Sequence, residues 1–118
     1  MESLNEQLQQ FTGSIGYHRL YPGIILTDGS LFLAEKAGCF WLMDVYASYL
    51  WMIDGNMEPF TTLKLTVHNE SGLVIIDDGN ENLLYQQTIE YTNFPLGQIK
   101  LYACWTEEFW VVMLPSEY

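Results

Sequence analysis

The stretch from Cys39 to Ile53, CFWLMDVYASYLWMI, constrains the fold more than any other part of this chain. It contains neither glycine nor proline, and most of its residues have adequate helix propensity. A membrane-spanning helix needs about 20 apolar residues with no charge near the middle, whereas this run is shorter and carries Asp44 near its centre. We therefore expect a central helix packed inside the protein, and no membrane segment.

If the stretch is helical, its polar side chains fall on one stripe. Spacings of three and four residues put these side chains on the same side: Trp41, Asp44, Ser48 and Trp51. A carboxylate walled by indoles and shielded from water would suit a general acid. The structural alternative is that Asp44 meets a backbone N–H, a tyrosine hydroxyl or solvent and holds the helix in place, which is the commoner role. Asp44 is the only candidate catalytic residue.

The rest of the chain divides into helical and extended patterns. Ser3 and Glu6 have the spacing of a capping box at a helix start, and Thr27-Asp28-Gly29 is a cap before a second helix over 30–37. Residues 16–25 are ambiguous between a loop and a short extended piece. After Pro59 the pattern favours strands, which we place at 60–68, 73–76, 84–91, 98–105 and 109–114.

Short connections between these strands favour antiparallel neighbours. The predicted fold is therefore α+β with two layers, in which N-terminal helices pack on a C-terminal antiparallel meander of about five strands. A chain of 118 residues suits one domain, so we expect residues 1–118 to share one core. Six phenylalanines, eight tyrosines and four tryptophans offer more aromatic surface than a small core needs, which favours an aromatic surface that meets a partner.

The charge of the chain argues against direct binding to nucleic acid. Four basic residues stand against fifteen acidic ones, for a net charge of −11, and nucleic-acid binding normally needs Lys and Arg to displace counterions. An acidic chain of this kind is attracted to basic surfaces or imitates a nucleic acid, or is simply well solvated.

Acidic residues gather in two predicted turns. Asp77, Asp78 and Glu81 lie in the first turn, and Glu107 and Glu108 in the second. The first turn does not have EF-hand spacing, so a hairpin turn is the better interpretation. If these carboxylates share one edge of the sheet they form an anionic strip, and we treat them, with the stripe of Asp44, as candidate binding residues.

The sequence predicts no metal site and no cofactor. His18 and His68 are the only histidines, and no Cys-x-x-Cys pair or close histidine pair supports a zinc site. Cys39 and Cys104 fit reduced, structural thiols, and the N-terminus lacks the features of a signal peptide. We expect a cytoplasmic protein.

Several strings taken together resemble a family of small, functionally uncharacterised bacterial proteins often found on plasmids, phages and other mobile elements. The strings are TDG at 27–29, WLMDVYAS at 41–48, DDGN at 77–80, YTNFP at 91–95 and the final LPSEY. The family pattern has YTDFP where this chain has Asn93, so a catalytic acid at that position would be missing here. The resemblance implies an accessory or anti-defence setting and no catalytic residues.

Two functional hypotheses follow. The first is a non-enzymatic, acidic interaction protein that binds another protein. In a more specific version, the partner is a basic nucleic-acid-binding protein, which this protein inhibits by imitating the charge of nucleic acid. The second is a small enzyme that uses Asp44 as general acid or base in an aromatic pocket. The residues also leave a homodimer open.

Overall fold

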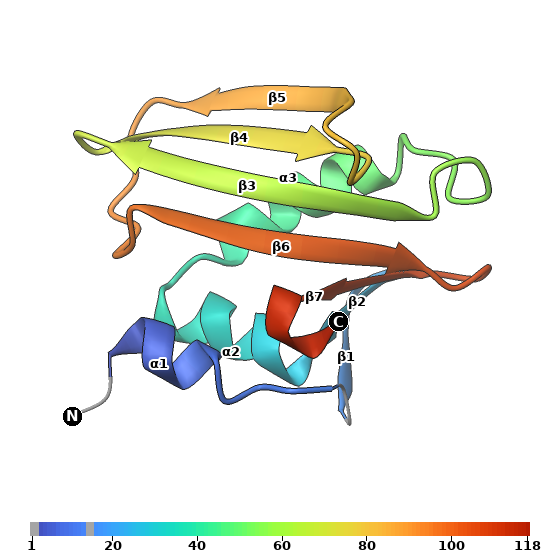
Figure 1. The fold of residues 1–118 in the computed structure, drawn as a ribbon, viewed down its shortest axis with the longest axis horizontal. Helices are drawn as coiled ribbons and strands as arrows, with labels where there is room; N and C mark the ends of the chain where they lie inside the picture. The colour runs from blue at the N-terminus through green and yellow to red at the C-terminus, as the bar shows by residue number, and fades with distance from the viewer. Residues whose placement is uncertain (1–2, 14–15) are drawn as a thin grey trace.

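A computed structural model describes residues 3–13 and 16–118 of the chain. It contains one sheet of seven strands and three short helices (Figure 1). The elements in chain order are α1 (Leu4–Leu8), β1 (Tyr17–Tyr21), β2 (Ile24–Thr27), α2 (Asp28–Lys36), α3 (Phe40–Leu50), β3 (Phe60–His68), β4 (Ser71–Asp77), β5 (Leu83–Ile89), β6 (Gln98–Trp105), β7 (Trp110–Met113) and the 3-10 turn η1 (Pro115–Glu117).

The strands lie in the order β1-β2-β7-β6-β3-β4-β5. Every neighbouring pair is antiparallel except β2 and β7, which run parallel. The β3–β4–β5 and β6–β7 hairpins form between consecutive strands. β6 does not follow β5 in space, however: it returns across the sheet to pair with β3.

The predicted two-layer α+β fold with a five-strand meander is therefore wrong: the protein is mostly β, with a mixed sheet. The sheet gains β1 and β2 from the segment that the sequence left ambiguous. β2 is too short to show a period-two pattern, and it becomes a strand because β7 offers it a parallel partner. The meander fails because β6 pairs with β3 rather than with its predecessor.

The three predicted helices are present, with shifted ends. The Ser3 hydroxyl accepts a hydrogen bond from the backbone N–H of Glu6 at 3.2 Å, which is the Ser3 half of the predicted capping box, and the helix ends at Leu8. The Thr27 hydroxyl accepts from the Ser30 backbone N–H and starts α2. α3 spans Phe40–Leu50, within the stretch that predicted it. None of the helices in the described part of the chain has the length and apolar character to cross a membrane.

α3 lies behind β3 and β4 in Figure 1 and buries its apolar side against the sheet. Tyr46 is completely buried there, and its hydroxyl lies 2.8 Å from the Thr61 hydroxyl. Tyr49 stacks on Tyr85 of β5, with ring centroids 4.8 Å apart. The opposite face of β3 and β4 has no helix in front of it among the described residues (Figure 1). One face of the sheet is thus core and the other, which we call the open face, meets solvent.

Candidate functional site

Asp44 lies at the protein surface, where its carboxylate accepts a hydrogen bond from Tyr21. The Tyr21 hydroxyl of β1 donates to Asp44 Oδ1 at 2.7 Å, and Asp44 is exposed to solvent. This bond, followed by desolvation and the charge of Asp44, raises the pKa of the Tyr21 hydroxyl. The bond joins α3 to β1, so Asp44 meets a tyrosine hydroxyl, as in the structural alternative to a catalytic role. An exposed carboxylate lacks the shielding from water on which its role as a general acid depended.

The other members of the stripe have separate surroundings. Ser48 is exposed and donates to the Val45 carbonyl oxygen of its own helix at 2.7 Å. The Trp51 indole N–H donates to the Pro22 carbonyl oxygen at 3.2 Å, and its ring lies against Tyr21, with centroids 5.5 Å apart. The structure thus brings Asp44 and Trp51 together around one tyrosine.

Trp41 lies apart from them, at the segment that follows β5. It lines a hollow of about 390 Å³ together with Ile89, Tyr91, Thr92 and Asn93. Two of the strings that suggested the family resemblance therefore meet in space here. Asn93 and Trp41 both line this hollow.

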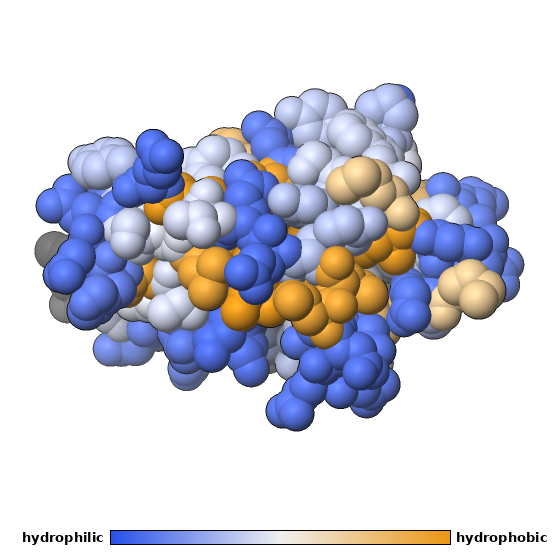
Figure 2. Space-filling model, turned by 90° about the horizontal axis from the view of Figure 1, so that it is seen from above, coloured by the Kyte–Doolittle hydropathy of each residue, from blue (hydrophilic) through white to orange (hydrophobic). Residues whose placement is uncertain are grey.

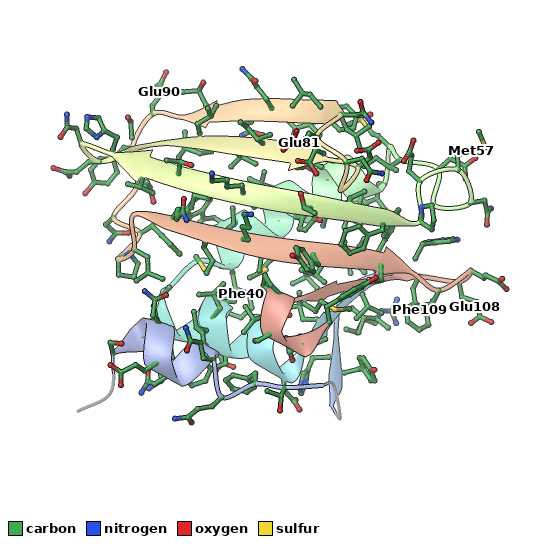
Figure 3. The ribbon with its side chains drawn as sticks, viewed as in Figure 1. Phe40, Met57, Glu81, Glu90, Glu108 and Phe109 are labelled. Carbon is green, nitrogen blue, oxygen red and sulfur yellow. The ribbon has the colours of Figure 1, made fainter. Side chains whose placement is uncertain are left out.

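The predicted acidic residues form two groups. Asp77, Asp78 and Glu81 belong to the β4–β5 turn, whereas Glu107 and Glu108 belong to the β6–β7 turn. Figure 3 shows Glu108 beyond the end of β6, away from Glu81. The side chains of the first group hold the turn together: Asp78 Oδ1 accepts from the Asn80 backbone N–H at 2.8 Å, and Asp77 Oδ1 accepts from the Gly79 N–H at 2.8 Å.

The Asp77 carboxylate also lies on the open face of the sheet, beside Thr62. The Thr62 hydroxyl donates to Asp77 Oδ1 at 2.6 Å. A hollow of about 460 Å³ begins here, and its lining residues come from β3, β4, β6 and the β4–β5 turn. They are Phe60, Thr62, Lys64, Ile75, Asp77, Gly79, Glu81, Lys100 and Tyr102.

Lys64 and Lys100 were not among the predicted site residues. The only sequence signal was that two of the four basic residues occupy predicted strands. Their meeting depends on the β3–β6 pairing, in which Lys64 is the register partner of Lys100, and the meander model had placed those strands apart. The hollow therefore contains charged groups that only the topology brings together.

A buried carboxylate joins the first and last parts of the sheet. Glu117 is 6% exposed, and its Oε1 accepts from the Thr27 hydroxyl at 2.6 Å and the Leu114 backbone N–H at 2.9 Å. Its Oε2 accepts from the Gly29 backbone N–H at 3.0 Å. The carboxylate thus lies at the N-terminal end of α2, where the helix dipole favours negative charge. Residues of the TDG and LPSEY strings of this chain therefore meet in space.

Neither cysteine offers a thiolate at neutral pH. Burial raises the pKa of the Cys39 thiol to about 12 and also raises the pKa of the Cys104 thiol. Within residues 3–13 and 16–118, no three His, Cys, Asp or Glu side chains are grouped so that they could hold a metal ion. Exposed charged groups and aromatic rings remain as the features from which a function can be proposed.

The chain belongs to a family of unknown function. The model of that family, described as "Family of unknown function (DUF6876)", matches residues 2–118. No curated protein and no solved structure matches the chain. The family match therefore places the whole sequence in one group without assigning it an activity.

Proposed function

We propose that the protein is a non-enzymatic interaction protein that binds an extended segment of a basic partner protein along the free edge of β5. The observation that carries the proposal is the composition of this edge strand. β5 has seven residues, LLYQQTI, with no charge and no proline. It pairs with β4 on one side and ends the sheet on the other, so its outer backbone groups are free to pair with another strand.

The opposite edge of the sheet is less suited to this. β1 has five residues, two of which are His18 and Arg19, and its pairing shifts register between Arg19 and Tyr21. Charged side chains and irregular pairing are features that discourage edge-to-edge contact. On β5 the single register shift falls at the start of the strand, so the pairing from Tyr85 to Ile89 is regular.

The surface around β5 supports a partner of defined chemistry. Figure 2 views the molecule from the β5 side, with hydrophobic surface through the middle and hydrophilic surface toward both ends. Leu83 is 58% exposed. Glu81 precedes the strand and Glu90 follows it (Figure 3). A partner strand with an uncharged, β-branched centre and a basic residue near each end would complement this surface.

The same charges disfavour self-pairing. If β5 paired with β5 of a second copy, glutamates would meet glutamates in either orientation, and each copy carries a net charge of −11. Like charges across a strand pair are destabilising. A second copy is therefore a poorer occupant of this edge than a basic partner.

A more specific proposal concerns the identity of the partner and where the protein acts, and it is based on the resemblance to bacterial proteins of mobile elements. The partner would be a basic nucleic-acid-binding protein of a host defence system, and the protein would act in the cytoplasm as its inhibitor. The chain has fifteen acidic residues and only four basic ones, which supports this version. The enzyme hypothesis has no comparable support, because the Asp44 carboxylate is exposed and bonded to Tyr21.

The test is selection of binding peptides from a random library, followed by titration of the best peptide. Enriched peptides should contain an uncharged, β-branched core flanked by Lys or Arg, and binding should protect the amides of residues 83–89 from hydrogen exchange. Because exposed ion pairs contribute about 0.2–1 kcal/mol each and reversal adds repulsion, the double variant Glu81→Lys/Glu90→Lys should weaken binding about tenfold.

The matched control is Glu107→Lys/Glu108→Lys, which changes the net charge equally but lies at the other turn. It should weaken binding far less at physiological salt. Equal losses in both double variants would mean that only net charge matters and would reject docking at β5. Protection confined to residues outside β5, or a dimer formed through β5, would also reject it.

A further inference from the structure

The open face carries a pair of lysines that repel one another. Lys64 of β3 and Lys100 of β6 are direct register partners, so both side chains leave the same face of the sheet at the same level. Like charges directly opposite each other destabilise a strand pair. The chain has only four basic residues, and half of them are placed in this unfavourable arrangement.

Among the described residues, neither lysine forms an ion pair. Within residues 3–13 and 16–118, the only ion pair joins His18 to Asp28, and neither lysine ammonium has a hydrogen-bond partner. Asp77 and Glu81 line the same hollow. Asp77 Oδ1 accepts from the Thr62 hydroxyl and the Gly79 N–H, and neither Asp77 nor Glu81 is within ion-pair distance of a lysine ammonium. Two ammonium groups therefore remain available to an external anion.

The hollow around the lysines has the size of a ligand site and two aromatic rings in its wall. The hollow of about 460 Å³ lies within the range of about 300–1,000 Å³ that is usual for small-molecule sites. Its wall includes Phe60 and Tyr102, whose rings pack edge to face with centroids 5.1 Å apart. Apolar walls with a few convergent charged groups are characteristic of pockets that bind small organic molecules.

We infer that this hollow binds a small organic anion, whose carboxylate or phosphate group lies between the ammonium groups of Lys64 and Lys100 while its apolar part contacts Phe60 and Tyr102. The net charge of −11 repels a polyanion such as nucleic acid. A small anion can contact the two ammonium groups without meeting most of that charge, because salt screens interactions beyond about 8 Å at physiological ionic strength, although Asp77 and Glu81 also line the hollow. The inference does not depend on the partner proposed for β5.

Phenyl phosphate is the main probe, and benzoate and inorganic phosphate are the comparison ligands. Saturable binding is measured by calorimetry, and contact with the lysines by NMR of their side-chain signals. Phenyl phosphate or benzoate should bind and shift the signals of Lys64 and Lys100, and the stronger of the two identifies the anionic group. Inorganic phosphate should bind more weakly, because it has no apolar part to contact the rings.

Three variants make the test specific: Lys64→Gln, Lys100→Gln and, as the matched control, Lys36→Gln, whose lysine lies on α2 over the Phe32 ring. Since a hydrogen bond to a charged group contributes about 1.5–3 kcal/mol, each of the first two should weaken binding tenfold or more, and the control by less than about twofold. Lys64→Gln and Lys100→Gln count as folded if their melting temperatures are at or above that of the Lys36→Gln control.

Two results would overturn the inference. One is no saturable binding of phenyl phosphate or benzoate to the natural protein. The other is an equal loss of affinity in the Lys36→Gln control, which would reduce the effect to net charge. If inorganic phosphate bound as tightly as phenyl phosphate, the proposed contact with Phe60 and Tyr102 would be wrong.

Discussion

At the scale of single residues, Gly29 shows how closely the Glu117 carboxylate packs against α2. A methyl group at Gly29 would collide with Glu117 Oε1 and with the Leu114 side chain. Both belong to buried residues, and the carboxylate is fixed by three hydrogen bonds. The carboxylate therefore cannot move aside without losing donors.

We predict that Gly29→Ala lowers the free energy of unfolding by about 1–3 kcal/mol, the usual cost of overpacking a filled site. Urea unfolding measures it. Gly97→Ala is the matched control, because nothing lies within 4 Å of a methyl group there. The control should leave stability unchanged or raise it slightly, and equal losses in the two variants would contradict the packing argument.

The Tyr21–Asp44 hydrogen bond makes a second residue-scale prediction, about alkaline pH. The pKa of the Tyr21 hydroxyl is raised above its ordinary value of 10.0 in the folded protein. The bond therefore stabilises the fold below pH 10, and this stabilisation is lost as the pH rises through the higher, folded-state pKa. Tyr21→Phe removes the titrating group and should flatten the alkaline loss of stability.

The measurement is urea unfolding of both proteins between pH 9 and about pH 11, above the ordinary tyrosine pKa of about 10. Tyr17→Phe serves as the control, because it removes an exposed tyrosine of the same strand. If the two variants had the same pH dependence, the Tyr21–Asp44 bond would not be the cause.

At the scale of elements, β5 combines two properties that are seldom compatible with a stable monomer. It is an edge strand, and it is uncharged along its length. Natural proteins usually protect such edges with lysine, proline or a bulge. Here the charges lie only outside the strand, at Glu81 and Glu90.

We predict that Thr88→Lys reduces aggregation at high protein concentration, because it places a charge on the exposed edge strand. Light scattering during mild heating measures this. Thr66→Lys changes the net charge equally on the open face but lies on β3, a central strand. It should reduce aggregation less, and an equal effect would show that net charge, not the edge, controls association.

Other elements were predictable to different degrees. α3 was predictable because a long stretch without glycine or proline that is apolar nearly all round is typical of a buried helix. β3 was predictable from its alternation, and β4 from a short apolar run that follows a turn. β1 and β2 were not, since a four-residue strand such as β2 has too few residues to establish a period, and its partner β7 lies more than eighty residues away.

At the scale of the whole molecule, the order of the strands determines which surfaces exist. Local connections make the β3–β4–β5 and β6–β7 hairpins, but the pairing of β6 with β3 joins them. This one pairing puts Lys64 opposite Lys100 and leaves β5 at the edge of the sheet. Both proposals thus depend on a long-range contact, which sequence periodicity does not encode because it reports only a residue's own strand.

The acidic residues show the same division. Their number was plain from the sequence, and it led to the prediction that the chain does not bind nucleic acid directly. Their placement was not: Asp77 and Glu81 line the hollow with the lysines, whereas Glu107 and Glu108 lie at a different turn.

The sequence by itself determined the helix caps, the buried central helix, the hairpin turns and the acidic charge, because each depends on residues that are near neighbours in the chain. Only the tertiary structure decided that Asp44 meets Tyr21, that Glu117 meets Thr27 and Gly29, and that Lys64 meets Lys100. The side-chain hydrogen bonds among these contacts join residues that are 23 to 90 positions apart in the chain. They follow from strand order, which is settled by how the sheet buries its apolar face against α2 and α3.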